Sequence, residues 1–130
     1  MDMNRMTIKL QEALQSASAL AMRRGHQGID VEHLLLALME QEGGIAGSLF
    51  EQAGVSPAAV RQAAEQALTK VAQVHGPGAA PGQIHLTPRL GSLLTKAEDR
   101  MKELRDEFVS VEHIILAMVD GIIQLESNNL

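Results

Sequence analysis

The sequence predicts an all-α fold built from two copies of one helical unit. Apolar residues make up 45% of the 130 residues, yet the only aromatic side chains are two Phe, so Leu, Ile, Val, Ala and Met must form the core. Leu, Ala and Met favour helices, and β-branched residues are comparatively few. Apolar residues recur at helical spacing, and the chain matches itself at a shift of 80 residues.

The first 73 residues predict four helices. We expect them over residues 6–24, 31–41, 45–53 and 57–70. Asp30 and Ser56 are typical N-cap residues, and Pro57 suits the first position of a helix. Gly25 and Gly54 suit the turn that ends many helices. The second of these helices is apolar nearly all round, so we expect it to be the central buried helix.

The second half of the chain repeats the same signals. Thr87 and Pro88 repeat the combination of an N-cap residue with a following proline, and Ser110 precedes the last apolar run. Two helices are expected, over residues 88–105 and 111–120. We expect Gly121 to end the second of them.

A shift of 80 residues superimposes residues 29–40 on residues 109–120 without a gap, and Thr7 falls on Thr87. A repeat of this kind is a unit whose apolar face must be covered by its neighbour, so we expect pseudo-twofold packing. The second copy has no match for the third and fourth helices, which predicts a truncated second repeat. Within one compact domain, the assigned segments are a first repeat at 1–73, a Gly/Pro-rich linker at 74–85, an incomplete second repeat at 86–121 and an atypical tail at 122–130.

Composition and charge exclude several classes of protein. Eleven Lys and Arg against sixteen Asp and Glu give a net charge of −5, which argues against binding to nucleic acid. The chain has no Cys, so disulfides and Cys-based zinc sites are excluded. Its start lacks the apolar stretch of a secretory signal, and its longest apolar run is far shorter than the roughly 20 residues that span a membrane. We expect a soluble, cytoplasmic protein.

Four motifs, in their order along the chain, resemble the Clp N-terminal domain. They are Asn-Arg-Met-Thr at 4–7, Ile-Asp-Val-Glu-His at 29–33, Gly-Val-Ser-Pro at 54–57 and Phe-Val-Ser-Val-Glu-His at 108–113. The resemblance covers residues 1–121. Because of the Gly/Pro-rich linker, it is greatest for the ClpB, or disaggregase, branch of the family. Regulatory subunits of Clp proteases, of the ClpA and ClpC types, are the alternative.

The resemblance implies two four-helix repeats that capture unfolded or aggregated client proteins, or adaptor proteins, without catalysis. In the family, ATP and Mg²⁺ bind to separate AAA+ modules. This sequence has no Gly-x-x-x-x-Gly-Lys-[Ser/Thr] phosphate loop, so we expect no cofactor. We expect the isolated domain to be a monomer, with dimerisation or swapping through the uncovered apolar face of the second repeat as the alternative.

Three polar residues are candidates for client contact because the resemblance carries them over from the family. They are Thr7, Asp106 and Glu112. Each has a structural alternative: Thr7 and Glu112 can cap or stabilise a helix start, and Asp106 can order a loop by accepting hydrogen bonds.

Three apolar residues of the second repeat are further candidates, namely Leu93, Met101 and Met118. A groove for unfolded segments needs exposed apolar side chains, and Met suits such a surface because it repacks easily. The alternative is that these residues belong to the core, as apolar residues at helical spacing commonly do.

The remaining classes lack a recognisable site. His33 and His113 are equivalent in the repeat, which raises the hypothesis of a metal site. Neither has a second His or Cys at ligand spacing, so we favour hydrogen bonding at the helix start and predict no metal. The sequence has no nucleophile-elbow motif, so it gives no indication of a hydrolase or peptidase. A helical DNA-binding regulator is a more remote alternative, since the basic residues are scattered.

Overall fold

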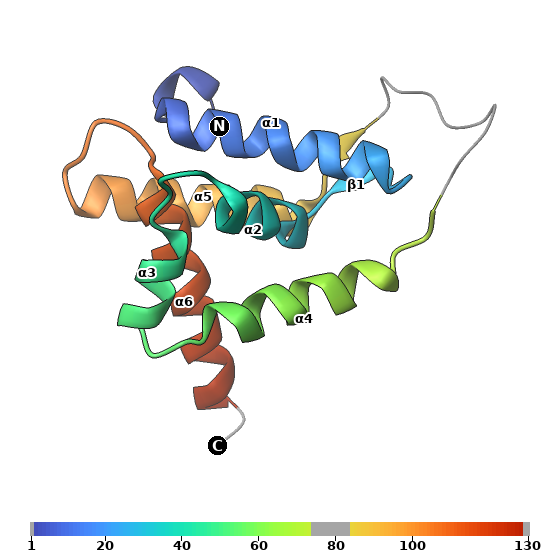
Figure 1. Ribbon diagram of the computed structural model, residues 1–130. Coiled ribbons are helices and arrows are strands. Elements are labelled where there is room, and N and C mark those ends of the chain that lie inside the picture. The colour runs from blue at the N-terminus through green and yellow to red at the C-terminus, as the bar shows by residue number, and fades with distance from the viewer. Residues whose placement is uncertain (1, 74–83, 129–130) are drawn as a thin grey trace.

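The computed structural model describes the backbone of residues 2–73 and 84–128, and side chains as far as residue 121 (Figure 1). This part of the chain is predominantly helical, which confirms the all-α prediction. Most of the predicted linker, residues 74–83, lies outside the described residues. The elements in order are η1 (Met3–Arg5), α1 (Ile8–Arg23), β1 (Gly28–Ile29), α2 (Val31–Glu40), α3 (Ala46–Gln52), α4 (Pro57–Thr69), β2 (His85–Leu86), α5 (Pro88–Glu103) and α6 (Val111–Asn128).

Equivalent backbone segments join the two repeats. β1 pairs with β2 in parallel, with Ile29 opposite Leu86, and a parallel bridge joins Met6 to Val109. The two pairs correspond, because the 80-residue shift carries Met6 onto Leu86 and Ile29 onto Val109. Each repeat therefore supplies the segment before its first helix to one pair and the segment before its second helix to the other. This reciprocal pairing is the pseudo-twofold arrangement predicted from the repeat.

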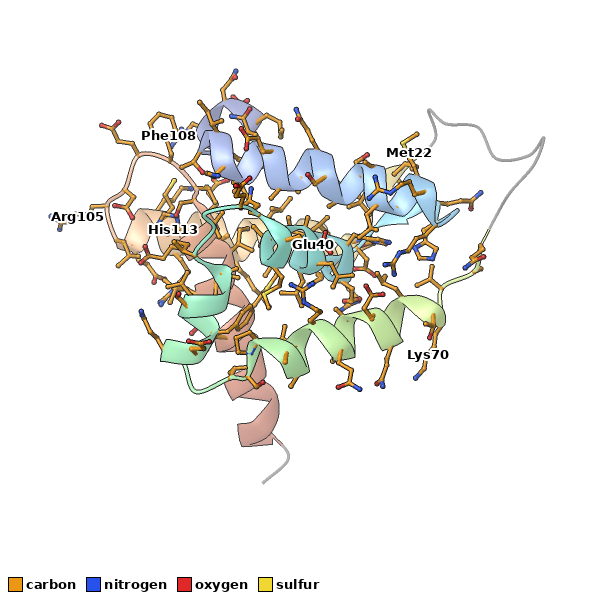
Figure 2. The ribbon with its side chains drawn as sticks, in the orientation of Figure 1. Met22, Glu40, Lys70, Arg105, Phe108 and His113 are labelled. Carbon is orange, nitrogen blue, oxygen red and sulfur yellow. The ribbon has the colours of Figure 1, made fainter. Side chains whose placement is uncertain are left out.

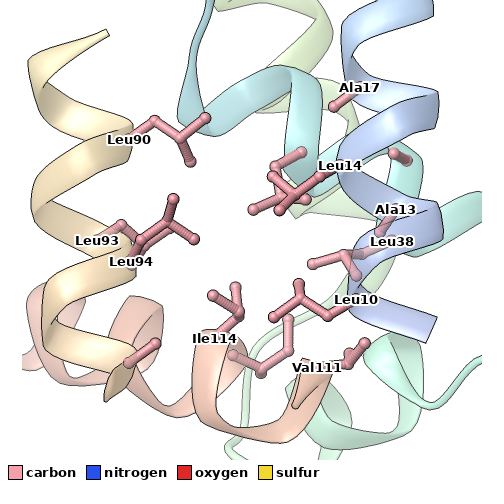
Figure 3. Packing of buried hydrophobic residues seen from close by; sticks show 14 of the residues in the cluster. Leu10, Ala13, Leu14, Ala17, Leu38, Leu90, Leu93, Leu94, Val111 and Ile114 are labelled. Atoms are coloured by element: carbon pink, nitrogen blue, oxygen red, sulfur yellow. The ribbon is translucent and has the colours of Figure 1, made fainter. Parts of the chain in front are cut away.

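One apolar core lies between the first two helices of each repeat. Figure 3 shows the leucines of α5 facing Leu10 and Leu14 of α1, with Ile114 of α6 between them. Leu38 of α2 belongs to the same buried cluster. Residues three and four positions apart fall on one face of a helix, and in each of these helices that face is turned towards the core, which buries these side chains. The apolar stripes read from the sequence are thus the packed faces of the helices.

α4 lies on the outside of α2, away from this core (Figure 1). It buries Ala64 and Leu68 against Leu36 of α2 in a second, smaller cluster. The guanidinium of Arg24, just after α1, donates two hydrogen bonds to the carboxylate of Glu65, at 2.7 and 3.0 Å. α4 therefore covers the end of the first repeat where α1 finishes.

α3 packs mainly on α6, so it connects the first repeat to the second. Ala46 and Phe50, one helical turn apart, are both only 1% exposed. A helix of seven residues is not stable alone, because its few hydrogen bonds do not offset the cost of starting it. Packing of these two side chains holds α3 in place.

α6 does not end at Gly121, so that prediction is wrong. After α2, the chain turns at Gly43, whose φ is 68°. The 80-residue shift places Gly121 opposite Gln41, and Ile123 opposite Gly43. A β-branched residue strongly disfavours a positive φ, so the equivalent turn is lost and the helix continues to Asn128. The truncation of the second repeat stays a prediction.

The loop after α5 contains a strained residue. Arg105 has φ 60°, the only positive φ among the described residues other than glycine (Figure 2). Its counterpart after α1 is Gly25, whose φ is 71°. The two loops have the same shape, but only the first has the residue that adopts it without steric cost.

Replacing Arg105 with Gly should therefore stabilise the protein. Relief of the left-handed conformation, less the greater entropy of glycine in the unfolded chain, should raise the free energy of unfolding by roughly 0.5–1 kcal/mol. Urea denaturation measures this change. Arg105→Ala is the control, because it removes the same side chain but keeps the Cβ; an equal gain from Ala would show that strain is not the cause.

Candidate functional site

Two hollows in the surface contain four of the six predicted contact residues. The larger, here called the apolar groove, has a volume of about 640 Å³ and includes Leu93 and Met118. The smaller, here called the polar hollow, has a volume of about 310 Å³ and includes Thr7 and Glu112. Met101 and Asp106 line neither hollow.

The apolar groove runs between α2, α5 and α6, with Phe50 of α3 and Val60 of α4 at its border. Leu93 is buried, with 8% of its surface exposed, and Met118 is half-buried. The side chains that define the groove are Val31 and Leu35 of α2, Leu93 and Lys96 of α5, and Ala117 and Met118 of α6. A largely apolar hollow of this size suits the apolar side chains of a polypeptide.

The polar hollow lies where α1 and α6 begin, next to the turn after α2. The Thr7 hydroxyl accepts a hydrogen bond from the Leu10 N–H at 3.3 Å, so Thr7 is the N-cap of α1 as well as part of the hollow. Glu112 is exposed in the first turn of α6. Ile45, 48% exposed, adds an apolar side chain. Lys9 also lines the hollow, and its ammonium group donates a hydrogen bond to the Glu42 carbonyl at 3.2 Å. The hollow therefore combines a hydroxyl, an ammonium group, a carboxylate and an apolar contact.

An ion pair marks the equivalent position in the other repeat. The Arg89 guanidinium donates to Glu32 at 2.8 and 3.1 Å and to Asp30 at 3.1 Å. The Thr87 hydroxyl donates to Asp30 at 2.9 Å. Glu112, the counterpart of Glu32, has no ion-pair partner within residues 2–73 and 84–121. Of the two equivalent carboxylates, Glu32 is thus ion-paired, whereas Glu112 is exposed and has no ion pair among the described residues.

Asp106 orders the loop before α6. It accepts a hydrogen bond from Nε2 of His113 at 2.8 Å, and Nδ1 of His113 accepts one from the Ser110 N–H at 2.9 Å (Figure 2). Asp106 is therefore linked to the start of α6 through the imidazole. This geometry matches the loop-ordering alternative, and a direct role in client binding stays a prediction.

Met101 lies in the core and does not reach a surface groove. Its side chain is 1% exposed, because it continues the apolar face of α5 that includes Leu94 and Ala97. Met101 therefore fits the alternative interpretation as a core residue. A client could touch this side chain only if the core opened.

A buried pair of imidazoles occupies the equivalent position in the first repeat. Nδ1 of His33 accepts a hydrogen bond from the Asp30 N–H at 2.9 Å, so the proton of neutral His33 is on Nε2. That nitrogen donates to Nδ1 of His26 at 2.8 Å. The predicted hydrogen bonding at the helix start is thus confirmed for His33.

His26 was missed in the sequence because it stands alone in a loop. The feature of the sequence that could have pointed to His26 is its alignment with Asp106 at the 80-residue shift. Burial lowers the pKa of His26, and Arg24 adds to the effect. Burial, together with the neighbouring His26, also lowers the pKa of His33. Both imidazoles are therefore held neutral at pH 7.

Residues 5–126 match the family described as the Clp repeat (R) N-terminal domain. The chain belongs to this family. It is 46% identical over 120 residues to the chaperone protein ClpB of Nitratidesulfovibrio vulgaris and 43% identical over 117 residues to that of Bacillus cereus. These matches cover 92% and 90% of this chain but only 14% of each relative, so the chain spans about a seventh of their length.

Solved N-domains of the Clp class share the fold. The Hsp104 N-terminal domain of Candida albicans has a TM-score of 0.72 at 19% identity, covering 92% of this chain and 79% of that one. The ClpV N-domain of Vibrio cholerae has a TM-score of 0.70 at 22% identity, covering 88% and 66%. A complex of a ClpV N-domain with a VipB peptide matches with a TM-score of 0.68 at 22% identity, covering 88% and 67%.

In ClpB-like proteins the Clp N-domain is a non-catalytic binding domain. Among the described helices of this chain, none has the length and apolar character needed to cross a membrane. Within the same residues, no three His, Asp or Glu side chains are grouped as metal ligands.

Proposed function

We propose that this chain is the substrate- and adaptor-binding N-terminal domain of an ATP-dependent ClpB-type chaperone. Its role is to bind unfolded or aggregated polypeptides at the apolar groove without catalysing chemistry. The observation that carries the proposal is the groove itself, in which Leu93 and Met118 offer apolar contact in a chain of the Clp N-domain family. Groove binding of this kind suits clients that expose apolar side chains.

Two comparisons support the proposal. Identity of up to 46% to ClpB chaperones favours the ClpB type over the ClpA and ClpC types. A ClpV N-domain with the same fold has been solved in complex with a VipB peptide. The proposal also covers the rest of the protein. The ATP and Mg²⁺ sites belong to AAA+ modules of the parent protein, which works in the cytoplasm. The isolated domain is a monomer that binds neither ATP nor Mg²⁺.

The polar hollow is proposed as a second point of contact. Glu112 has no ion-pair partner among the described side chains and is exposed, so it can accept hydrogen bonds from N–H groups or basic side chains of a client. Thr7 lies in the same hollow. Asp106 acts at a distance by holding His113 at the start of α6.

Titration with a permanently unfolded protein, such as reduced and carboxymethylated α-lactalbumin, tests the proposal. NMR shifts are expected at Leu35, Leu93 and Met118, with binding that tolerates salt because the contact is apolar. Met118→Asp should weaken binding roughly 10-fold, since a charge in the groove must be desolvated. Ile8→Asp is the matched control, because Ile8 is 73% exposed and lies in neither hollow.

Two results would contradict this function. One is the absence of shifts in both hollows at millimolar client. The other is an equal loss of binding in the Ile8 and Met118 variants, which would indicate non-specific adhesion. Glu112→Gln separates the two hollows, since it should weaken binding only for clients that also reach the polar hollow.

A further inference from the structure

We propose that α4 is a lid on the first repeat, which opens from α2 while the core shared by the two repeats stays folded. The ion pair between Arg24 and Glu65 holds the lid closed. Opening uncovers the outer face of α2, where Leu36 is buried by the closed lid, and gives the domain a second folded state. This state needs no client, so it goes beyond the proposed function and is tested separately from it.

α4 has a weak apolar attachment for its length. Only two of its 13 residues, Ala64 and Leu68, are buried, whereas α1 and α5 each bury five of 16. Both belong to the small cluster around Leu36. Among the described side chains packed on the shared core, α4 contributes only the half-buried Val60. A segment with few buried apolar contacts opens at a lower free energy than the whole domain unfolds, so α4 meets the first requirement of a lid.

The small cluster beneath α4 borders a hollow in the surface. Leu20 of α1 packs against the cluster and lines a hollow of about 270 Å³ between α1 and α2, together with Ala37 and Glu40. Leu20 is half-buried, so water already reaches one side of the cluster. Side chains next to a hollow have fewer packing contacts to lose. Lifting α4 therefore costs less than separating the helices of the shared core.

Ion pairs supply much of the remaining attachment. The Arg24 guanidinium donates two hydrogen bonds to Glu65, at 2.7 and 3.0 Å, which join α4 to the end of α1. Arg61 of α4 donates to the Met39 carbonyl at 3.4 Å and lies 3.8 Å from the Glu40 carboxylate, at the end of α2. Each of the four paired side chains is at least 34% exposed, so salt screens both pairs. The bidentate pair has the better geometry, and we expect it to contribute more.

The chain before α4 provides a hinge. The Val55 N–H donates to the Phe50 carbonyl at 2.9 Å beyond the end of α3, and Gly54 turns the chain with φ 79°. One residue later, Ser56 caps α4 by accepting a hydrogen bond from the Ala59 N–H at 3.3 Å. The end of α3 and the start of α4 are therefore each closed by their own local bonds. A rotation between Val55 and Ser56 moves α4 and leaves α3 in place.

Native-state hydrogen exchange, followed by NMR, tests the lid. A detached helix of 13 residues is marginal in water, so its amides exchange in the open state. Relative to intrinsic rates, the amides of residues 61–69 should exchange roughly 30-fold faster, or more, than those of Leu14 in α1 and Leu94 in α5. Their rates should barely respond to about 1 M urea, because local opening exposes little surface. Equal protection and equal urea dependence in the three helices would overturn the inference, because α4 would then open only when the whole domain unfolds.

Glu65→Gln tests the ion pair. This substitution removes the charge but keeps a side chain of the same size, and it should speed the exchange of α4 about 5-fold. Salt at about 1 M should speed it about 3-fold in the wild type and less in the variant. Glu98→Gln is the matched control, because Glu98 forms a partly exposed ion pair with Lys102 on α5, at 3.2 Å, and should leave α4 unchanged. An unchanged rate for Glu65→Gln, or an equal increase for both variants, would overturn the inference.

Ile114→Val separates local opening from global unfolding. Ile114 is buried in the shared core, and loss of one methylene group is mild enough for the variant to fold. It should speed the slowest amides of α1 and α5 about 5-fold, because they exchange through global unfolding. The rates in α4 should stay the same, since Ile114 remains packed when the lid opens. A parallel increase in α4 would show that it has no opening of its own, and would overturn the inference.

Discussion

Replacing Phe50 with Ala is expected to lower the free energy of unfolding by about 3–4 kcal/mol. Phe50 is 1% exposed and lies in the core cluster that contains residues of both repeats. Truncation removes a large apolar side chain from water-free packing and leaves a cavity. Because α3 is short and packs on α6, its loss should also weaken the contact between the repeats.

Urea denaturation followed by circular dichroism measures the effect. Met118→Ala is the control, because Met118 is half-buried at the groove and its truncation should cost clearly less. A loss below about 1 kcal/mol for Phe50→Ala would mean that α3 does not hold the repeats together.

Mild acid is expected to destabilise the protein through His26 and His33. Both are buried, and burial lowers the pKa of each below the ordinary value of 6.5. The unfolded chain therefore binds more protons than the folded chain once the pH falls below about 6.5. Stability should be constant from pH 8 to 7 and should fall from pH 6.5 towards 5, with a limiting slope of about 1.4 kcal/mol per pH unit for each histidine that stays neutral.

The surrounding groups do not reverse this direction. Arg24 lowers the pKa of both imidazoles, whereas Asp30 and Glu32 raise that of His33, each by less than burial lowers it, and the net pKa of His33 is lowered. Glu65, whose pKa is lowered by its hydrogen bonds with Arg24, titrates at lower pH. Its loss of stabilisation therefore occurs in a separate, more acidic range.

Two variants of His26 test the cause. His26→Asn keeps an acceptor for Nε2 of His33 but cannot be protonated, so it should remove about half of the acid-induced loss. His26→Asp copies the Asp106–His113 pair of the second repeat and should favour the charged form of His33, so stability should no longer fall between pH 6.5 and 5. Urea midpoints at each pH give the measurement. A wild-type midpoint that is the same at pH 7 and pH 5.5 would contradict the mechanism.

The helices and the repeat could be predicted from the sequence because their signals are local. Asp30, Ser56 and Thr87 cap the helices that they were predicted to cap, since capping depends on neighbours within one turn. Residues at i, i+3 and i+4 form the buried faces. The prediction that α6 ends at Gly121 is wrong, because Gly121 is not the counterpart of the turn residue Gly43. That counterpart is Ile123, which disfavours the turn.

Only part of the candidate site could be predicted from local sequence signals. Met101 and Met118 follow the same helical spacing, and nothing local in the sequence separates them. Only packing places the first in the core and the second in the apolar groove. In the same way, Glu32 and Glu112 occupy equivalent helix starts, but Arg89 pairs with the first from 57 residues away.

By itself, the sequence determined the helical class, the capped helix starts, the 80-residue repeat and its pseudo-twofold consequence. The tertiary structure decided which equivalent positions differ: which carboxylate lacks an ion pair, which imidazole meets another imidazole, and which apolar face α3 covers. The physical reason is range. Helix formation and capping depend on contacts within a few residues, whereas burial, ion pairing and the openness of a groove depend on side chains brought together from distant parts of the chain.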